Sequence, residues 1–239
     1  MISFIIPTLS EEAVIEKILM NLKQYTGNAQ IIVSDGGSHD RTAEIARRYT
    51  EDVLVYRGEK RQTIAGGRNA GAAIARGEYF VFLDADTHIP DPDTFFAHII
   101  SSFEKNPKLV ASNVNIRVHK DMETFGDSIV FPFLNLSYRF MNNILGVGAS
   151  SGEFQMIRRD AFQKIGGYDE RLVAGEDQDC FRRLSKIGRT ECQGSLTIFH
   201  TGRRAHAIGW PKLLWTWSLD SLWVIFSGRA RSRVWTEIR

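Results

Sequence analysis

Cysteine is almost absent from this chain of 239 residues, and its scarcity excludes two classes of small protein. Cys180 and Cys192 are the only cysteines and no CxxC spacing occurs, so the sequence indicates neither a disulfide framework nor a zinc site. Two isolated thiols fit a reducing compartment. The sequence also has no internal repeat and no low-complexity linker, while 43% of it is hydrophobic. We therefore expect one large domain with at most a small appendage.

Two common nucleotide-binding signatures are missing as well. The chain contains no GxxxxGK[ST] sequence, and no GxGxxG follows its first predicted strand. Both absences argue against P-loop and dinucleotide-binding proteins. The N-terminus begins directly with the strand-like ISFIIPT, without a basic region or a long apolar run, so we expect no signal peptide and a cytoplasmic location.

Short apolar segments alternate with helical patterns in the first half of the chain. The predicted strands are residues 2–6, 31–33, 53–56 and 79–83. The predicted helices are residues 11–25, residues 42–49 and a small-residue segment that contains Gly66 and Gly67. This alternation predicts an α/β fold with a mostly parallel sheet flanked by helices and a ligand cleft at the carboxyl ends of its strands.

The segment EYFVFLDADT joins a buried strand to two carboxylates. Residues 79–83 are apolar without polar alternation, which is typical of a strand buried on both faces of a parallel sheet. Asp84 and Asp86, separated by Ala85, must lie at the end of that strand, because carboxylates are not buried without a partner or a metal. The two can reach one divalent cation together with substrate phosphate oxygens. The alternative is a pair that caps the next helix.

Two more residues are expected beside the same cleft. Asp35 follows its strand directly and could accept hydrogen bonds from a nucleobase or a ribose. Arg68 is near the start of a glycine-rich helix, where its guanidinium could bind phosphate, although an exposed surface arginine is the alternative. Asp40 is more simply explained as a helix cap.

The second half is expected to supply the acceptor side. The predicted elements are a helix at residues 95–103, strands at 109–118 and 152–157, and helices at 160–165 and 179–187. Glu176 and Asp177 lie just before the last of these helices, where the helix dipole alone would favour acidic residues. His200 ends the strand-like TIFH and could be a further metal ligand or a packed histidine. Arg203 and Arg204 follow it and could close over a diphosphate.

Several motifs occur in the order found in one enzyme family. They are PTLSEE, VSDGGSHDRT, GGRNAG, ARGEYFVFLDADT and GGYDERLVAGEDQD. Over roughly residues 1–205 the chain resembles the family 2 glycosyltransferases. The resemblance implies the GT-A fold, a nucleoside-diphosphate sugar donor such as a UDP- or GDP-sugar, and inversion at the anomeric carbon. One departure is the sequence Ser10, Glu11, Glu12, where many members have Asn followed by Glu.

The resemblance also implies residue roles. The region from Thr8 to Glu12, with Glu11, would hold the nucleoside together with Asp35, and Arg68 would lie near it or near the diphosphate. The implied metal site is the DxD of Asp84, Ala85 and Asp86, binding Mn²⁺ or Mg²⁺. Glu176 and Asp177 match the family's Glu-Asp motif, in which the aspartate is the base. Residues 1–105 would then form the nucleotide-sugar-binding half and residues 106–205 the acceptor-binding half.

Two other classes of protein are alternatives to a glycosyltransferase. Inverting transfer needs one carboxylate that removes the proton from an attacking hydroxyl, and a metal that neutralises the departing diphosphate. A nucleotidyltransferase that makes a nucleotide-sugar would place a glycine-rich loop after the first strand, but residues 8–12 contain no glycine. A sugar-nucleotide-binding protein without catalysis is the third possibility.

The segment 206–239 is basic and rich in tryptophan. From Gly202 onward seven Lys/Arg stand against two Asp/Glu, which gives a local net charge of +5 in a chain of net charge +2. All five tryptophans fall in the last thirty residues. A predicted amphipathic helix at 211–227 suits the interface of an anionic membrane, and a packed or oligomerising helix is the alternative. Without a recognised module we expect no nucleic-acid partner.

Membrane association would make a lipid-linked saccharide or glycolipid the leading acceptor. It would also place the protein on the cytoplasmic face of the membrane. Residues 125–147 are rich in aromatics and leucine but too polar to span a bilayer. They predict an amphipathic helix that covers the acceptor side of the sheet.

Overall fold

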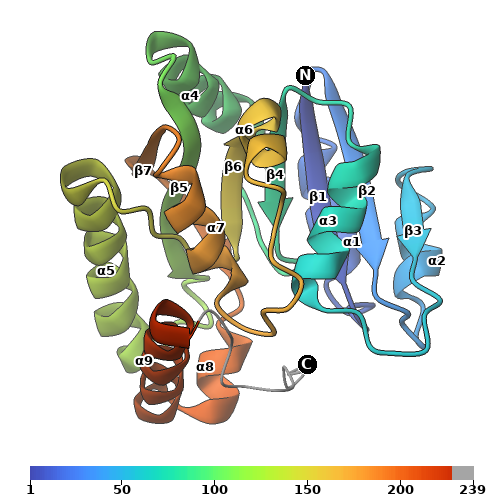
Figure 1. Cartoon of the computed structure of the whole chain (residues 1–239). Helices are drawn as coiled ribbons and strands as arrows, with labels where there is room; N and C mark the ends of the chain where they lie inside the picture. Colours follow the sequence, from blue (N-terminus) through green and yellow to red (C-terminus); the bar gives the residue numbers. More distant parts are fainter. Residues whose placement is uncertain (228–239) are drawn as a thin grey trace.

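The computed structural model describes the backbone of residues 1–227 and the side chains of residues 1–219 (Figure 1). Its centre is a seven-stranded sheet in the order β3-β2-β1-β4-β6-β5-β7. The strands are β1 (Ile2–Thr8), β2 (Ala29–Asp35), β3 (Val53–Val55), β4 (Tyr79–Leu83), β5 (Leu109–Val118), β6 (Phe154–Arg158) and β7 (Arg189–His200). Strand β6 runs antiparallel to both neighbours, while the other pairs are parallel. The prediction of a mostly parallel α/β sheet is confirmed.

Helices cover both faces of the sheet. They are α1 (Ile15–Leu22), α2 (Thr42–Ala46), α3 (Ile64–Ile74), α4 (Pro92–Lys105), α5 (Phe125–Arg139), the π-helix η1 (Phe140–Leu145), α6 (Arg159–Lys164), α7 (Glu176–Leu184), α8 (Arg203–Ile208) and α9 (Trp210–Ser227). One buried cluster joins the sheet to α1, α2, α4 and α5, and a second joins it to α3, α6 and α7. Figure 1 shows α3, α6 and α7 together on the face nearer the viewer.

The helix predicted at residues 11–25 is shorter than expected. Helix α1 begins only at Ile15, because the preceding residues are held by the loop after β2. The N–H of Glu11 donates to the Thr42 hydroxyl at 2.8 Å, and Ser10 has a left-handed φ of 56°. These contacts keep the acidic residues of this loop out of the helix and beside the carboxyl end of β1.

Strand β7 and helix α7 also differ from their predictions. A strand was expected only at residues 197–200, but β7 begins at Arg189 and pairs with β5 across a register shift. Its first half contains Glu191, Gln193 and Gly194, so no apolar run marks it. Helix α7 begins at Glu176 instead of residue 179, since the left-handed φ of 77° at Gly175 ends the preceding loop.

The predicted C-terminal helix is present as α9, and its first turn packs on α5. Trp210 and Leu213 are buried, and the Trp210 indole donates to Asp127 at 2.9 Å and meets the Phe131 ring at 5.2 Å. The side chains of residues 220–227 lie outside the described part of the chain, as do residues 228–239, so the predicted amphipathic character of this helix stays a prediction. Within residues 1–227, no helix combines the length and apolarity needed to cross a membrane.

Candidate active site

The predicted site residues gather at one edge of the sheet, where the parallel strands β1, β2 and β4 end. Thr8 and Asp35 are register partners at the ends of β1 and β2, and Asp84 follows β4 directly. Because β6 is antiparallel, its first residue, Phe154, pairs with Leu83 at the end of β4. The residues before β6 therefore reach the same edge, which is where α/β sheets bind ligands.

Asp35 is buried and organises the loop after β2. Its Oδ2 accepts the N–H groups of Gly37 at 3.1 Å and Ser38 at 2.9 Å, and its Oδ1 accepts the Thr8 hydroxyl at 3.3 Å and the Ser38 hydroxyl. Gly37 has a φ of 91°, which favours glycine. The structure thus gives Asp35 and Thr8 a role in shaping the loop, while their contact with a nucleoside stays a prediction.

Arg68 is fully buried, so the alternative of an exposed surface arginine is wrong. It lies on α3, whose start is capped by the Thr63 side chain. Its Nη1 donates to Glu176 at 2.8 Å, and its Nη2 donates to Asp84 at 3.3 Å and to the Gly152 carbonyl at 3.0 Å. The guanidinium therefore joins the end of β4 to the start of α7, and its direct binding of phosphate stays a prediction.

Gly152 and Tyr168 complete the surroundings of Arg68. A Cβ atom at Gly152 would lie 2.7 Å from Nη2 of Arg68, so any larger residue there would force the guanidinium to shift. Cζ of Arg68 lies over the ring of Tyr168, 5.3 Å from its centroid. Burial alone would lower the pKa of Arg68, but the surrounding tyrosine and acidic groups raise it above its usual value. Arg68 therefore remains a cation among carboxylates.

Asp177 is the most strongly perturbed carboxyl group of the site. It occupies the first turn of α7, where its Oδ1 accepts the N–H of Gln178 at 2.7 Å. Burial and the neighbouring charge of Glu176 raise the pKa of Asp177 to about 8, against the opposing effect of Arg68. The pKa of Asp84 is also raised, first by burial, although its side chain is 39% exposed. Burial thus disfavours the charged form of Asp177, and less decisively that of the partly exposed Asp84.

Arg203 connects α8 to the loop after β1. Its Nη1 and Nη2 donate to the two carboxylate oxygens of Glu11 at 2.7 and 2.6 Å, and its Nε lies 3.5 Å from Oδ2 of Asp86. Asp86 also accepts the Thr201 hydroxyl. Burial lowers the pKa of Arg204 below its usual value, and the charge of Asp84 partly opposes this effect. Arg204 therefore also interacts with the charges of the site.

His200 stands apart from the aspartates in its contacts. Its ring packs edge-on against Phe131 at 5.0 Å, and its Nδ1 accepts the N–H of Gly202 at 3.3 Å. Its buried Nε2 has no hydrogen-bond partner. Among the side chains of residues 1–219, no three His, Cys, Asp or Glu are close enough to form a metal site. The sequence prediction that His200 joins Asp84 and Asp86 at a metal stays a prediction.

The composition of the edge nevertheless fits a divalent cation. Six carboxylates (Glu11, Asp84, Asp86, Glu153, Glu176 and Asp177) stand against three arginines (Arg68, Arg203 and Arg204) in the network of charges. Carboxylate oxygens are ligands that Mn²⁺ and Mg²⁺ prefer. A cation at Asp84 and Asp86 would offset part of the excess negative charge.

Glu153 is a site residue that the sequence analysis missed. Its Oε2 is buried without a hydrogen-bond partner, and its charge raises the pKa of Asp84, Asp177 and Tyr138. It precedes β6, so only the antiparallel direction of that strand brings it to the carboxyl edge of β4. In the sequence GEFQ, Glu153 stands at the start of a predicted strand. The sequence did not predict that this strand runs antiparallel, so it did not place Glu153 at the carboxyl edge of β4.

The fold defines the class of protein, and the sequence comparison then gives the family. Similar solved structures are GT-A glycosyltransferases. The sequence matches the family model described as "Glycosyl transferase family 2" over residues 3–166. The chain therefore belongs to glycosyl transferase family 2, as the motifs predicted.

Curated relatives support the same family. The succinoglycan biosynthesis protein ExoA of Rhizobium meliloti is 30% identical over 194 residues, covering 77% of this chain and 58% of that protein. The beta-monoglucosyldiacylglycerol synthase of Trichormus variabilis is 27% identical over 195 residues, covering 77% of this chain and 41% of the synthase. The chain thus spans about half the length of these relatives.

Two solved structures illustrate the likeness in fold. The mannosyltransferase PcManGT of Pyrobaculum calidifontis, in complex with GDP-Man and Mn²⁺, has a TM-score of 0.67 and 21% identity, covering 84% of this chain and 56% of that one. The glucosyl-3-phosphoglycerate synthase of Mycobacterium tuberculosis, in complex with Mn²⁺ and UDP-glucose, has a TM-score of 0.62 and 20% identity, covering 97% of this chain and 80% of that one. At these identities the likeness establishes the fold alone.

Proposed function

We propose that the protein is an inverting, metal-dependent glycosyltransferase that moves a sugar from a UDP- or GDP-sugar to a hydroxyl acceptor. The observation that carries this proposal is that Arg68 binds both Asp84 and Glu176, the residue that precedes Asp177. Asp84, on the donor side, is bound to Arg68, and Asp177, on the acceptor side, lies next to Glu176, which Arg68 also binds. This arrangement separates a group for the leaving diphosphate from a group for the attacking hydroxyl.

Asp177 is the base of the proposed reaction. The acceptor oxygen forms a bond to the anomeric carbon while its proton passes to the Asp177 carboxylate, and the bond to the diphosphate breaks with its electron pair on the leaving oxygen. A pKa raised to about 8 makes this carboxylate a stronger base than an ordinary aspartate. Glu176, fixed by Arg68, positions the first turn of α7 that carries the base.

Asp84 and Asp86 would hold the cation, Mn²⁺ or Mg²⁺. When bound, the metal supplies positive charge that stabilises the departing diphosphate. The fold neighbours in complex with Mn²⁺ and a nucleotide-sugar support this choice of cofactor. We retain His200 as a further candidate ligand because its buried Nε2 has no partner, although its present contacts are with Phe131 and Gly202.

The remaining residues are proposed to hold the nucleotide-sugar. Asp35 and Thr8 shape the loop that would receive the nucleoside, and Ala85 would lie between the two metal-binding aspartates. Arg203 would exchange its bond to Glu11 for the diphosphate, with Arg204 next to it. Donors bound by fold neighbours include GDP-Man, UDP-GlcNAc and UDP-glucose, so either nucleobase is compatible with the fold.

The proposed acceptor is a hydroxyl of a lipid-linked saccharide or a glycolipid. One relative is named as a synthase of beta-monoglucosyldiacylglycerol and another as a succinoglycan biosynthesis protein. A base such as Asp177 suits a hydroxyl nucleophile, whereas a phosphate acceptor is already ionised and needs none. The protein would then act as a peripheral protein at the cytoplasmic face of a membrane.

Release of nucleoside diphosphate tests the proposed function. A panel of UDP- and GDP-sugars is offered with Mn²⁺ and with glycolipid or oligosaccharide acceptors. We expect Asp177→Asn to lower turnover by about 100-fold or more, while Asp160→Asn, which alters an exposed aspartate in the first turn of α6, leaves it unchanged. Equal turnover in Asp177→Asn and the parent would rule out Asp177 as the base. Pyrophosphate release from a nucleoside triphosphate would instead identify a nucleotidyltransferase, and binding without turnover would identify a non-catalytic protein.

A further inference from the structure

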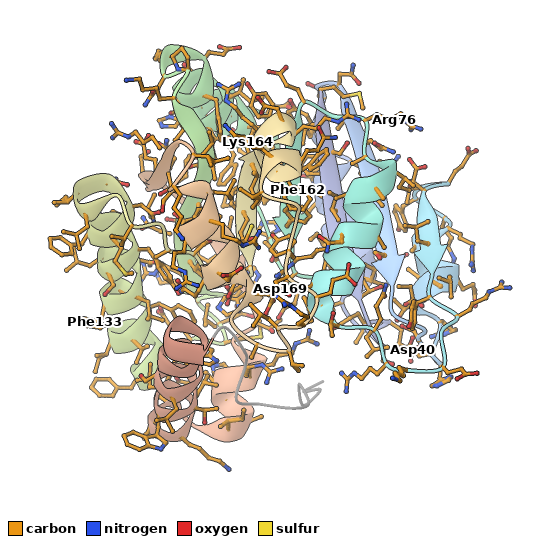
Figure 2. All side chains as sticks on the ribbon, viewed as in Figure 1. Asp40, Arg76, Phe133, Phe162, Lys164 and Asp169 are labelled. Atoms are coloured by element: carbon orange, nitrogen blue, oxygen red, sulfur yellow. The ribbon has the colours of Figure 1, made fainter. Side chains whose placement is uncertain are left out.

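The outer surface of α5 and η1 is unusually apolar. Thirteen large hydrophobic side chains are exposed among the described residues, and nine of them lie between positions 122 and 147. They are Met122, Phe125, Ile129, Phe133, Leu136, Phe140, Ile144, Leu145 and Val147. Phe125 is 83% exposed and Ile144 is 72% exposed. In Figure 2, Phe133 projects from α5 away from the sheet.

These side chains share one side of a continuous helical segment. Most of them recur at steps of three or four residues, which is the spacing of one helix face. The opposite side packs inward through the buried Phe131 and Asn135, and Asn135 bonds both the N–H and the carbonyl of Ile116 on β5. The buried residues of the segment are mostly polar (Asp127, Asn135 and Asn142, with Phe131), so most of its large apolar side chains face outward instead of inward. At about 1.5 Å per residue, α5 and η1 together extend about 30 Å.

The exposed side also lacks carboxylates. Residues 125–147 contain only two charged residues, Asp127 and Arg139. Asp127 is buried and accepts hydrogen bonds from Thr124 and Trp210. Arg139 is turned toward β7, where its Cδ would lie 2.8 Å from a Cβ atom at Gly194. A helix face in contact with water normally carries charges, and a contiguous apolar patch without them marks an interaction surface.

Basic residues and tryptophans at the C-terminal end of the sequence favour an anionic bilayer as the partner of this surface. The first turn of α9 packs on α5 through Trp210, and α9 exposes Lys212 and Trp215, the latter by 68%. After α9 the sequence of residues 228–239 contains four arginines and one glutamate. Tryptophan and basic residues beside an apolar face suit the interface with anionic headgroups.

We propose that this surface, formed by the nine exposed residues of α5, η1 and the segments directly before and after them and called here the apolar face, docks on an anionic lipid bilayer. The proposal deepens the proposed function, because the partner would carry the lipid-linked acceptor. Helix α5 touches the site through α8, since Asp127 contacts His206 at 2.7 Å and Arg203 on the same helix binds Glu11. Docking through the apolar face would thus set the carboxyl edge of the sheet next to the membrane.

Vesicle sedimentation of the full chain tests the proposal without requiring turnover. Phosphatidylcholine vesicles with and without phosphatidylglycerol are compared for the parent and for a triple variant, Phe133→Gln, Leu136→Gln and Phe140→Gln. These side chains are 49–68% exposed, so the fold should tolerate the changes. We expect partition onto phosphatidylglycerol vesicles to fall by about ten-fold or more. The matched control is Met20→Gln, an apolar residue 55% exposed on α1, which should bind as the parent does. Equal binding of the triple variant and the parent would overturn the proposal.

A fluorescent label reports insertion directly. Both native cysteines are buried, so single variants Phe133→Cys and Met20→Cys can each be labelled with an environment-sensitive dye. We expect a blue shift on vesicle addition at position 133 and none at position 20. Vesicle binding without a shift at position 133 would contradict docking through the apolar face. A lipid-free dimer that the triple variant dissociates would also overturn it, in favour of a second copy of the chain.

Failure of this proposal can be told apart from failure of the proposed function. Vesicle binding is measured without donor, and transfer is measured with an acceptor that is soluble in water. Transfer without vesicle binding would contradict only the docking proposal, and vesicle binding without transfer would contradict only the glycosyltransferase proposal.

Discussion

Arg68 and Glu176 are 108 positions apart in the sequence and meet in a hydrogen bond of 2.8 Å. The same guanidinium reaches Asp84 at 3.3 Å and is almost completely shielded from water. One buried cation therefore fixes the distance between the strand end that would hold the metal and the helix that would hold the base. A substitution of Arg68 should therefore disturb the site even though it leaves Asp84 and Asp177 unchanged.

Removal of Arg68 should destabilise the fold strongly. In Arg68→Met, Glu176 would remain buried without its cation, and breaking a buried ion pair from one side costs about 3–5 kcal/mol. The free energy of unfolding in urea measures this loss. Arg48→Met is the matched control, because Arg48 pairs with Glu44 on the surface, where such a pair contributes about 0.5 kcal/mol or less. Similar losses in the two variants would contradict the role given to Arg68.

Stability should depend on pH through Asp177. Because folding raises its pKa from 3.8 to about 8, the folded state favours the protonated form, and the contribution of Asp177 to stability is lost as pH rises from about 4 to about 8. The stability of Asp177→Asn relative to the parent should therefore increase over this interval and level off above it. Urea unfolding at several pH values, without metal, checks the sign. A constant difference between the two proteins would contradict the raised pKa.

The same pKa predicts the pH dependence of turnover. If the carboxylate of Asp177 removes the acceptor proton, the rate should fall as pH drops below about 8, because the group becomes protonated. The measurement is kcat against pH with saturating donor. A rate that stays flat from about pH 6 to about pH 9 would contradict a base with this pKa.

Metal binding should stabilise the protein through Asp84 and Asp86. Mn²⁺ with UDP or GDP, at about 100 times the dissociation constant, should raise Tm by roughly 5 °C, and chelator should reverse the shift. In Asp86→Asn the shift should be lost or much reduced. Asp121→Asn, at an exposed aspartate in the turn before α5, serves as control and should shift like the parent. An undiminished shift in Asp86→Asn would place the metal elsewhere.

Arg203 should contribute to donor binding. The two Nη atoms of the Arg203 guanidinium donate to the two carboxylate oxygens of Glu11. The same pair of parallel hydrogen bonds suits two oxygens of a diphosphate. We expect Arg203→Gln to raise the KM for the nucleotide-sugar by about ten-fold. The control is Arg117→Gln, whose surface partner is Glu123. An unchanged KM in Arg203→Gln would limit Arg203 to holding α8 against the loop after β1.

Truncation after Ser227 should weaken binding to anionic vesicles selectively. It removes four arginines and one glutamate, and each basic residue near an anionic surface contributes about 1 kcal/mol. Binding to zwitterionic vesicles, which would depend on the apolar face, should change little. Truncation from residue 210 is less informative, because Trp210 is part of the core and bonds Asp127. Equal binding of the truncated and parent chains to both vesicle types would show that residues 228–239 do not contribute to vesicle binding.

Local patterns alone were enough to predict much of this protein. The apolar run of β4 followed by Asp84 and Asp86 predicted a buried strand that ends in two carboxylates, and the structure has both. Strands that alternate with helices predicted the parallel part of the sheet. The order of motifs predicted the family. Each of these depends on residues close together in the sequence, where the alternation of side chains and the cost of burying a charge act directly.

Several features of the site could not be predicted in this way. Nothing near Arg68 indicates that it is buried against Glu176 and Asp84, because its partners come from α7 and β4. Glu153 reaches the site only because β6 reverses direction in the sheet. The polar first half of β7 becomes a strand because β5 offers an unpaired edge.

The sequence by itself therefore determined the secondary structure around the carboxylates, the family and the residue types available for catalysis. Only the tertiary structure decided which of those residues meet, which are shielded from water, and that the outer side of α5 has no protein partner within the described part of the chain. The physical reason is that helix and turn preferences depend on residues close together in the sequence, whereas burial, charge pairing and hydrogen bonds between distant side chains depend on the order and direction of the strands.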